Sequence, residues 1–257
     1  MNTRFHVVIP ARYASTRLPG KPLLDIAGKP MIQHVYEAAL ASGAASVTVA
    51  TDDRRIESAV QHAGGVAVMT GKDHASGSDR IAEACSVLGL ADDEVVVNVQ
   101  GDEPQMPPSL IRQVAELLVV REDAAMATLC TPFIGAGEFA DSSAVKVVLG
   151  DADRAVYFSR APVPWHCSRD SSDLSGEAWQ HAFRHLGIYA YRSGYLRTFS
   201  GRGPCPLERR ERLEQLRVLW HGECIACALA VEAPPAGVDT AEDLAGVRLR
   251  LEGNPES

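Results

Sequence analysis

Cationic and hydroxyl side chains are concentrated in a short segment near the start of the chain. Residues 10–22 read PARYASTRLPGKP and combine three cations, two aliphatic hydroxyls and a glycine. Arginine supplies forked donors, lysine supplies a point charge and loop amides add N–H groups, so this set suits a polyphosphate. Neither GxxxxGK[ST] nor GxGxxG is present, and a solvated loop is the alternative interpretation. The candidate nucleotide-binding residues are Pro10, Ala11, Arg12, Ser15, Arg17 and Lys21.

A second candidate site follows a valine-rich run in the middle of the chain. The segment EVVVNVQGDEP leads from this run into Gln100, Gly101 and Asp102. A carboxylate that follows a buried strand beside a glycine can hold Mg²⁺, which prefers oxygen ligands and takes some of them from phosphates. The alternative is a turn in which Asp102 caps the next helix. The sequence therefore predicts a magnesium ligand at Asp102.

Two further polar segments lie where predicted strands end or predicted helices begin. Asp52 follows the strand SVTVAT, where it either caps the next helix or contacts a nucleotide. The segment HASGSDR begins a helix, and an arginine one turn in can reach back toward an anion at the helix N-terminus. The candidate nucleotide-binding residues of this second loop are His74, Ser76, Gly77 and Arg80.

Strands and helices alternate in the first half of the chain, which gathers these loops at one place. Such alternation is typical of a parallel sheet with right-handed crossovers, whose strands bind ligands beyond their C-terminal ends. Apolar β-branched runs predict the strands, and apolar residues at helical spacing predict the helices. The expected strands lie near residues 5–9, 46–51, 66–70 and 94–99, and the expected helices near 29–43, 53–65, 75–89 and 107–119.

The pattern changes after residue 123. Strands are expected near 124–133, 142–150, 154–165 and 185–192 without long helices between them, which indicates antiparallel or mixed pairing. The Ser- and Asp-rich segment 166–181 is typical of a mobile loop. A helix is expected within residues 203–222, a strand near 224–232 and a last helix after Thr240, where VDTAEDL matches a helix-capping pattern. The whole chain predicts an α/β fold, a three-layer α/β/α domain with a mostly parallel, Rossmann-like central sheet and an antiparallel or mixed extension.

Composition excludes several classes of protein. The chain has 257 residues, with 25 Lys and Arg against 33 Asp and Glu, so its net charge is −8. This charge argues against a general nucleic-acid surface or an anionic-membrane surface. No apolar run approaches the roughly 20 residues that span a bilayer, and Pro10 and Arg12 interrupt any signal-peptide pattern. We therefore expect a cytoplasmic protein with no nucleic-acid or membrane partner.

The six cysteines fit reduced thiols better than a metal site. Only Cys224 and Cys227 have CxxC spacing, and they lie in a predicted strand, where they would point to opposite faces. No second pair is available to complete a zinc site. We therefore expect no zinc.

The motifs together resemble a known family. IPARYASTRLPGKPL is similar to the N-terminal motif of nucleotide-sugar pyrophosphorylases, and more closely to that of the cytidylyltransferases that activate acidic sugars. The similarity recurs at NVQGDEP, YFSRAPVPW, HLGIYAYR, LEQLRVLW and GVDTAEDL, so it covers nearly the whole chain. It departs at Arg209 and Arg210, where members of the family often have a histidine and an apolar residue.

The resemblance implies an activity and a set of roles. It implies CMP transfer from CTP to 3-deoxy-D-manno-octulosonate (Kdo), with release of pyrophosphate, for lipopolysaccharide biosynthesis. Arg17 and Lys21 would carry the triphosphate. Asp239 would join Asp102 as a second Mg²⁺ ligand, although a helix cap is the alternative for this segment. The residues that would face the sugar are Gln100, Arg160, His185, Tyr189, Glu214 and Gln215.

The resemblance also implies an organisation of the chain. It implies a single nucleotidyltransferase domain, 1–257, with a nucleotide-binding half, 1–123, a sugar-binding and dimerisation segment, 124–200, and a C-terminal segment, 201–257. A homodimer is expected. Three alternatives stay open: Glu214 and Gln215 as an ordinary solvated helix face, another acidic sugar such as sialic acid or amino-Kdo, and a nucleotide-binding protein without activity.

Overall fold

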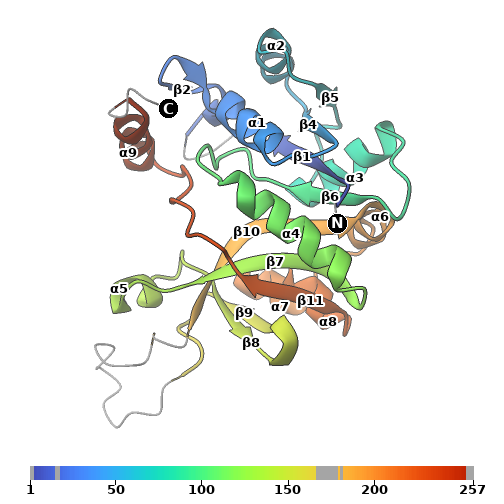
Figure 1. Ribbon diagram of the computed structural model, residues 1–257, viewed down its shortest axis with the longest axis vertical. Helices are drawn as coiled ribbons and strands as arrows, with labels where there is room; N and C mark the ends of the chain where they lie inside the picture. Colours follow the sequence, from blue (N-terminus) through green and yellow to red (C-terminus); the bar gives the residue numbers. More distant parts are fainter. Residues whose placement is uncertain (1–2, 15–17, 166–178, 180–181, 253–257) are drawn as a thin grey trace.

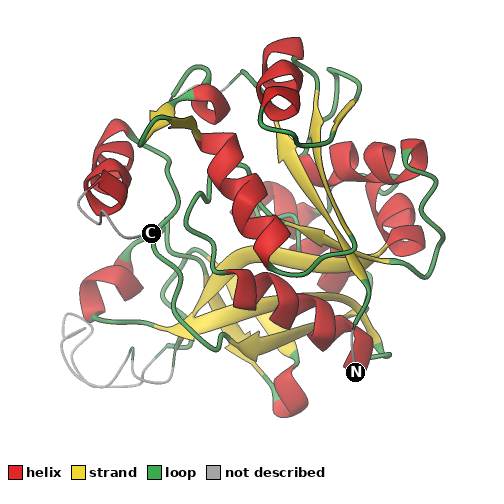
Figure 2. Cartoon of the chain, turned by 45° about the horizontal axis from the view of Figure 1, so that its top comes forward, coloured by secondary structure: helices red, strands yellow, loops and turns green. Residues whose placement is uncertain are grey.

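The computed structural model describes residues 3–14, 18–165, 179 and 182–252, and its centre is a nine-stranded sheet. Figure 2 shows the strands through the middle of the molecule, with helices on both sides. The sheet contains β1 (Phe5–Ala11), β4 (Ser46–Thr51), β5 (Ala67–Met69), β6 (Val95–Asn98), β7 (Ala124–Pro132), β8 (Lys146–Leu149), β9 (Ala155–Ser159), β10 (Phe183–Arg192) and β11 (Cys224–Leu229), and a separate hairpin joins β2 (Asp25–Ile26) to β3 (Lys29–Pro30).

The sheet order is β11-β7-β10-β6-β1-β4-β5, with β8 paired to β10 and β9 to β8. β1 pairs in parallel with β4 and with β6, and β4 pairs in parallel with β5. β10 runs antiparallel to β6, β7 and β8, and β8 antiparallel to β9. The expected parallel core with an antiparallel extension is confirmed. β10 comes late in the chain, yet it lies beside β6 and brings the second half of the chain against the first.

The helices form two layers around the sheet. Figure 1 shows α1 and α4 crossing the near face of the sheet. Each face of the sheet packs on its own apolar cluster, with Val7 and Ile9 in one and Val8 in the other. Burial on both faces explains why the successive residues Val7, Val8 and Ile9 of β1 are all apolar. The helices are α1 (Met31–Ala41), α2 (Arg54–His62), α3 (Gly77–Val87), α4 (Pro108–Val120), α5 (Ala136–Ala140), α6 (Ser193–Ser200), α7 (Pro206–Glu211), α8 (Leu216–Trp220), α9 (Ala241–Glu252) and the 3₁₀ turns η1 (Lys21–Leu23) and η2 (Asp151–Asp153).

The helix expected within residues 203–222 is interrupted. α7 ends at Glu211, its C-cap Arg212 adopts the left-handed conformation with φ 54°, and α8 begins at Leu216. The Glu208 carboxylate of α7 accepts hydrogen bonds from Arg217 of α8, at 2.6 and 2.8 Å. The interruption leaves residues 213–215 in a short connection between two helices.

The placement of the CxxC cysteines and the length of the helices can be read from the fold. Cys224 and Cys227 belong to the clusters on opposite faces of the sheet, as the strand pattern predicted. Among the described helices, none is long and apolar enough to cross a membrane. The segment 166–181 lies almost entirely outside the described residues.

Candidate active site

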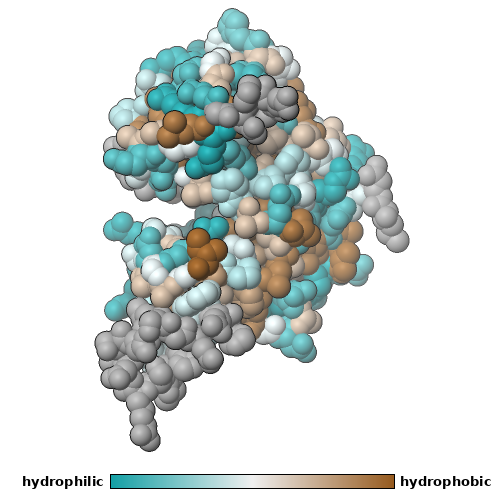
Figure 3. Space-filling model, turned by 60° about the vertical axis from the view of Figure 1, so that its left-hand side comes forward, coloured by the Kyte–Doolittle hydropathy of each residue, from teal (hydrophilic) through white to brown (hydrophobic). Residues whose placement is uncertain are grey.

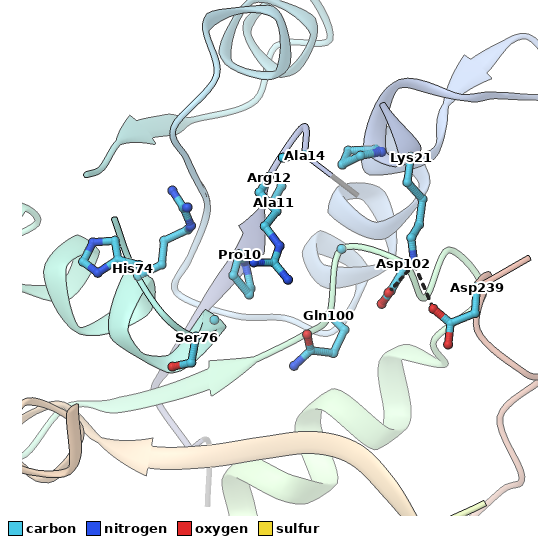
Figure 4. Close-up of a pocket in the computed structure, with 14 residues that line it drawn as sticks. Pro10, Ala11, Arg12, Ala14, Lys21, His74, Ser76, Gln100, Asp102 and Asp239 are labelled. Atoms are coloured by element: carbon cyan, nitrogen blue, oxygen red, sulfur yellow. Dashed lines mark hydrogen bonds and ion pairs between the residues drawn. The ribbon is translucent and has the colours of Figure 1, made fainter. Parts of the chain in front are cut away.

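A cavity of about 360 Å³ opens beyond the C-terminal ends of β1 and β6. Figure 4 shows its walls, which come from the end of β1, from η1, from the start of α3, from the loop after β6 and from the segment before α9. Most of the side chains predicted to bind a nucleotide or Mg²⁺ meet here. The lining residues are Pro10, Ala11, Arg12, Ala14, Lys21, Pro22, His74, Ser76, Gly77, Arg80, Gln100, Gly101, Asp102 and Asp239.

Parallel pairing brings the two loops of this cavity together. Val8 of β1 is in register with Asn98 of β6, so the residues that follow both strands leave the sheet at the same edge. Gly101 allows their close approach, because a Cβ atom there would lie 3.0 Å from the backbone oxygen of Pro10. The glycine of the QGDEP motif is therefore required by packing between these loops.

Lys21 is the charged centre of the cavity. Gly20, with φ 69°, starts the turn η1 that presents this side chain. The Lys21 ammonium donates to Asp102 Oδ2 at 2.7 Å, to Asp239 Oδ1 at 3.0 Å and to the Val238 carbonyl at 2.8 Å. Figure 4 shows both carboxylates on the same side of the lysine. Three oxygen atoms from distant segments thus surround one cation.

The segment that carries Asp239 is held in place by its own hydrogen bonds. The Val238 amide donates to the Asp102 carbonyl at 2.8 Å. Asp243 accepts from the amides of Asp239 and Thr240, at 3.0 and 2.8 Å, and its own amide donates to the Thr240 hydroxyl. The predicted helix cap therefore exists and belongs to Thr240 and Asp243, while the Asp239 carboxylate faces Lys21.

The arrangement of Asp102 and Asp239 fits a hard divalent cation. Their carboxylate oxygens and a carbonyl oxygen already converge on a positive charge, and oxygen ligands are those that Mg²⁺ prefers. Within the described residues, no group of three or more His, Cys, Asp and Glu side chains could hold a metal ion. Bound Mg²⁺ would therefore complete its shell with water and phosphate oxygens, which is its usual behaviour.

The first turn of α3 forms the opposite wall of this first cavity. Ser76 is its N-cap, and Asp79 returns a hydrogen bond to complete a capping box. Arg80 is buried, and its guanidinium donates to Asp52 Oδ2 at 2.9 Å and to Thr70 Oγ1 at 2.6 Å. Asp52 does not line the cavity; it orients Arg80. The residue that caps α2 is Asp53.

His74 is oriented from behind by an acidic side chain. One ring nitrogen contacts the Glu83 carboxylate, which also accepts the Gly71 amide at 2.9 Å. The hydrogen bond from His74 is the largest cause that holds the pKa of Glu83 below its ordinary value. The charged Glu83 carboxylate therefore fixes the His74 imidazole at the wall of the first cavity.

A second, larger cavity of about 690 Å³ shares Gln100 with the first. Figure 3 shows the molecule hollowed between its upper and lower parts. All six residues expected to face a sugar line this second cavity. Its walls contain Gln100, Glu103, Glu138, Asp141, Ser143, Ala144, Val145, Arg160, Arg184, His185, Leu186, Gly187, Tyr189, Arg212, Leu213, Glu214, Gln215, Pro234, Pro235 and Gly237.

Two ring side chains of β10 in the second cavity, His185 and Tyr189, are neutral near pH 7. Burial lowers the pKa of His185 to about 3 and raises that of Tyr189 well above its ordinary value. The His185 ring packs on Phe158 and Tyr189, with centroids 4.9 and 5.4 Å apart, and its Nε2 lies 3.0 Å from the Thr128 hydroxyl. These two side chains can therefore exchange hydrogen bonds with hydroxyl groups without carrying charge near neutral pH.

Three buried polar atoms on residues that line the second cavity lack a hydrogen-bond partner within the described part of the chain. Among the described residues, Arg184 Nε, Glu214 Oε1 and Gln215 Nε2 are the buried side-chain nitrogen and oxygen atoms that make no hydrogen bond. Buried polar atoms are usually satisfied, and a ligand can supply the missing partner. Two donors and one acceptor in one cavity suit a ligand with both carboxylate and hydroxyl groups.

Arg160 is held rigidly at the edge of this cavity. Its Nε donates to the Glu211 carbonyl at 2.8 Å, and its amide donates to the Glu211 carboxylate at 3.0 Å. Its own carbonyl accepts from the buried Lys146 at 3.1 Å. A guanidinium fixed in this way is prepared to receive a carboxylate.

Several predicted positions fall elsewhere. Ser15 and Arg17 lie outside the described residues. Arg209 and Arg210 are exposed and do not line the second cavity, so the departure from the family pattern is kept away from it.

Sequence reasoning missed several charged residues of the second cavity. Glu103 and Arg184 each adjoin a predicted site residue, and that adjacency was a usable signal. Burial, with the nearby Asp102 adding to it, raises the pKa of Glu103 to about 8. The other missed residues, which no motif marked, are Glu138, Asp141 and Arg212.

The chain is similar in sequence to several known proteins over nearly its whole length. The chain is 55% identical over 245 residues to 3-deoxy-manno-octulosonate cytidylyltransferase of Idiomarina loihiensis, covering 95% of this chain and 97% of that one. It is 53% identical over 252 residues to the enzyme of that name from Halorhodospira halophila, covering 96% and 97%.

A solved structure of CMP:2-keto-3-deoxy-manno-octonic acid synthetase complexed with CTP matches with a TM-score of 0.87 and 44% identity, over 97% of this chain and 99% of that one. A cytidylyltransferase from Leptospira borgpetersenii, at 14% identity and a TM-score of 0.60, shares the fold. The family model for cytidylyltransferases matches residues 6–225. The chain therefore belongs to the cytidylyltransferase family.

Proposed function

We propose that this chain transfers CMP from CTP to the anomeric hydroxyl of Kdo and releases pyrophosphate. The observation that carries the proposal is the junction of two cavities at Gln100: Lys21, Asp102 and Asp239 line the first, and residues of the second carry unsatisfied donors and an acceptor. The names of the similar proteins, and the CTP bound to one of them, support the choice of substrates.

The nucleotide cavity would hold CTP by charge and by backbone contacts. Lys21, with Arg17 from the neighbouring loop, would carry the triphosphate, and the first turn of α3 would offer amides to an anion. The backbone around Ala11 and Arg12, together with Ser15, would frame the cytosine. In such reactions positioning and charge neutralisation supply most of the rate, because no protein nucleophile is required.

Asp102 and Asp239 would hold Mg²⁺ at the side of the cavity nearest the sugar site. Bound Mg²⁺ would neutralise phosphate charge and favour the ionised form of the attacking hydroxyl. Lys21 keeps the two carboxylates facing each other before the substrates bind.

The second cavity would orient the sugar acid. Arg160 would receive its carboxylate, and His185, Tyr189, Glu214 and Gln215 would exchange hydrogen bonds with its hydroxyls. Gln100, which lines both cavities, would lie beside the reacting hydroxyl. The anomeric oxygen would then attack the α-phosphorus in line with the departing pyrophosphate.

Pyrophosphate release tests the proposal and the identity of the sugar. The protein is incubated with Mg²⁺, one nucleoside triphosphate and one sugar, where the triphosphates are CTP, UTP, ATP and GTP and the sugars are Kdo, amino-Kdo and N-acetylneuraminate. Release with CTP and Kdo alone is expected. Release with CTP and another acidic sugar would show that the second cavity selects that sugar instead of Kdo. No release with any pair would contradict the proposal.

We propose further that the protein acts as a homodimer assembled through segment 124–200, and that it works in the cytoplasm to supply activated Kdo for lipopolysaccharide. The resemblance of the sequence motifs supports the dimer and the lipopolysaccharide role, and the net charge of −8, with no apolar run long enough to span a bilayer, supports the cytoplasm. Sedimentation analysis tests the dimer.

A further inference from the structure

Ser78 is a buried hydroxyl on the first turn of α3, between the two cavities. It is 2% exposed, and its Oγ donates to Glu214 Oε2 at 2.6 Å. Ser78 lines neither cavity, whereas Glu214 lines the second. The neighbouring Gly77 lies against Pro10 at the edge of the nucleotide cavity, where an added Cβ would be 3.4 Å from Pro10 Cγ. Ser78 therefore joins a wall of the first cavity to an acceptor in the second.

The turn that holds Ser78 is fixed from several directions. Ser76 and Asp79 form the capping box, and Asp79 Oδ1 also accepts the Ser200 hydroxyl of α6 at 2.8 Å. Arg80 is held by Asp52 at 2.9 Å. Because the cap is made by Ser76, the Ser78 hydroxyl is not needed to start the helix. Its hydrogen bond acts on Glu214.

Arg217 is a charged neighbour that competes with Ser78 for the Glu214 carboxylate. Arg217 Nη2 lies 3.6 Å from Glu214 Oε1, too far for a hydrogen bond. The Arg217 guanidinium already binds Glu208, at 2.6 and 2.8 Å. Glu214 Oε1 thus remains buried without a hydrogen-bond partner among the described residues. A carboxylate released from Ser78 would be able to rotate toward Arg217.

We propose that Ser78 is a positioning residue for the sugar acid: its hydroxyl fixes Oε2 of Glu214 so that Oε1 receives a sugar hydroxyl. The inference rests on the proposed function, because it assumes that the second cavity binds the sugar. It predicts that the Ser78 hydroxyl affects sugar binding far more than CTP binding. It also predicts that threonine, which keeps a hydroxyl on Cβ, will serve at this place.

The experiment compares steady-state kinetics of Ser78→Ala with the wild-type protein, with CTP and Kdo varied in turn. Loss of a hydrogen bond to a charged group should raise KM for Kdo about tenfold, with KM for CTP and kcat changed by less than about threefold. Ser78→Thr should restore KM for Kdo. Ser200→Ala is the matched control, since it removes a hydrogen bond from the same helix start without touching Glu214.

Ser78→Val and Ser78→Thr form a second pair of nearly equal shape that differs in the hydroxyl, and thermal melting of each variant checks its folding. The inference is overturned if Ser78→Ala leaves KM for Kdo unchanged, if Ser200→Ala raises it equally, or if KM for CTP rises as much. A wild-type protein without activity would overturn the proposed function, and this inference with it. An active wild type with an unaffected Ser78→Ala variant would overturn the inference alone.

Discussion

Opposite charges from distant parts of the chain converge at single residues of the first cavity. Lys21, Asp102 and Asp239 come from three distant segments and meet within 3.0 Å. Each carboxylate alone has an ordinary structural explanation, a turn or a helix cap. Their meeting around one cation goes beyond what a turn and a helix cap require of them, and it favours a role for both in binding Mg²⁺.

Replacing Asp102 by asparagine should lower kcat by on the order of 100-fold or more, because a neutral amide is a poor substitute for a metal-binding carboxylate. The fold should persist, since the side chain is only partly buried, with 37% of its surface exposed. Steady-state kinetics and thermal melting measure the two effects. Asp93→Asn is the matched control, an exposed aspartate before the start of β6. Equal activity of both variants would remove the metal role of Asp102.

His185 predicts a pH dependence of stability. Its pKa falls from 6.5 to about 3 in the folded protein because it is buried. The unfolded chain therefore binds the proton more readily than the folded protein. The contribution of His185 to folding stability is present above pH 6.5 and is lost as the pH falls from 6.5 toward 3.

Denaturant titrations at several pH values between 7 and 4 should therefore show a flatter decline in unfolding free energy for His185→Gln than for the wild-type protein. The exposed His62 provides the control, and His62→Gln should follow the wild-type curve. Parallel curves for all three proteins would show that His185 does not cause the effect.

Secondary-structure elements were largely predictable where the apolar pattern was regular. The strands and helices of the first half lie close to their expected ranges, since each strand is apolar and each helix has a clear apolar face. The short helices α5 and α6 and the hairpin β2-β3 were missed. They have too few residues to show a period, and their positions depend on tertiary contacts.

The candidate site was predictable to a similar extent. Motifs identified the residues that line both cavities, but the hydrogen bonds between them depend on side-chain packing that one sequence does not reveal. Asp52 illustrates this: it was expected at a nucleotide or a helix cap, and it binds Arg80. Glu103 and Arg184 were missed although each adjoins a predicted site residue, whereas Glu138 and Asp141 were missed because only the fold places them against the second cavity.

The interruption between α7 and α8 also belongs to this scale. Arg212 adopts φ 54° and ψ 46°, a conformation that costs a residue with a Cβ roughly 1 kcal/mol. Arg212→Gly should therefore be more stable than Arg212→Ala by about 1 kcal/mol, because both variants lack the side chain and only the alanine is strained. Chemical denaturation measures the difference. A more stable alanine variant would indicate that this turn is not left-handed in solution.

At the scale of the molecule, the strand β10 makes one site from two halves of the chain. It pairs with β6 and with β7, so the sugar cavity on the second half opens beside the nucleotide cavity on the first. Gln100 lines both. The sheet thus places the two cavities next to each other.

Ligand binding should stabilise the whole fold in a metal-dependent way. Saturating CTP with Mg²⁺ should raise the melting temperature by roughly 5 to 10 °C, because binding at a hundredfold excess over Kd adds about 2.7 kcal/mol. CTP with a chelator should give a much smaller shift, and UTP with Mg²⁺ serves as the nucleotide control. Equal shifts with and without Mg²⁺ would contradict the proposed ion.

Transfer of CMP to an acidic sugar can be followed with a labelled nucleotide. The protein is incubated with Mg²⁺, Kdo and CTP that carries radioactive phosphorus in the α position. The label should enter a sugar nucleotide while unlabelled pyrophosphate is released in equal amount. Label that stays in CTP, or that appears as CMP at the same rate with and without Kdo, would contradict it.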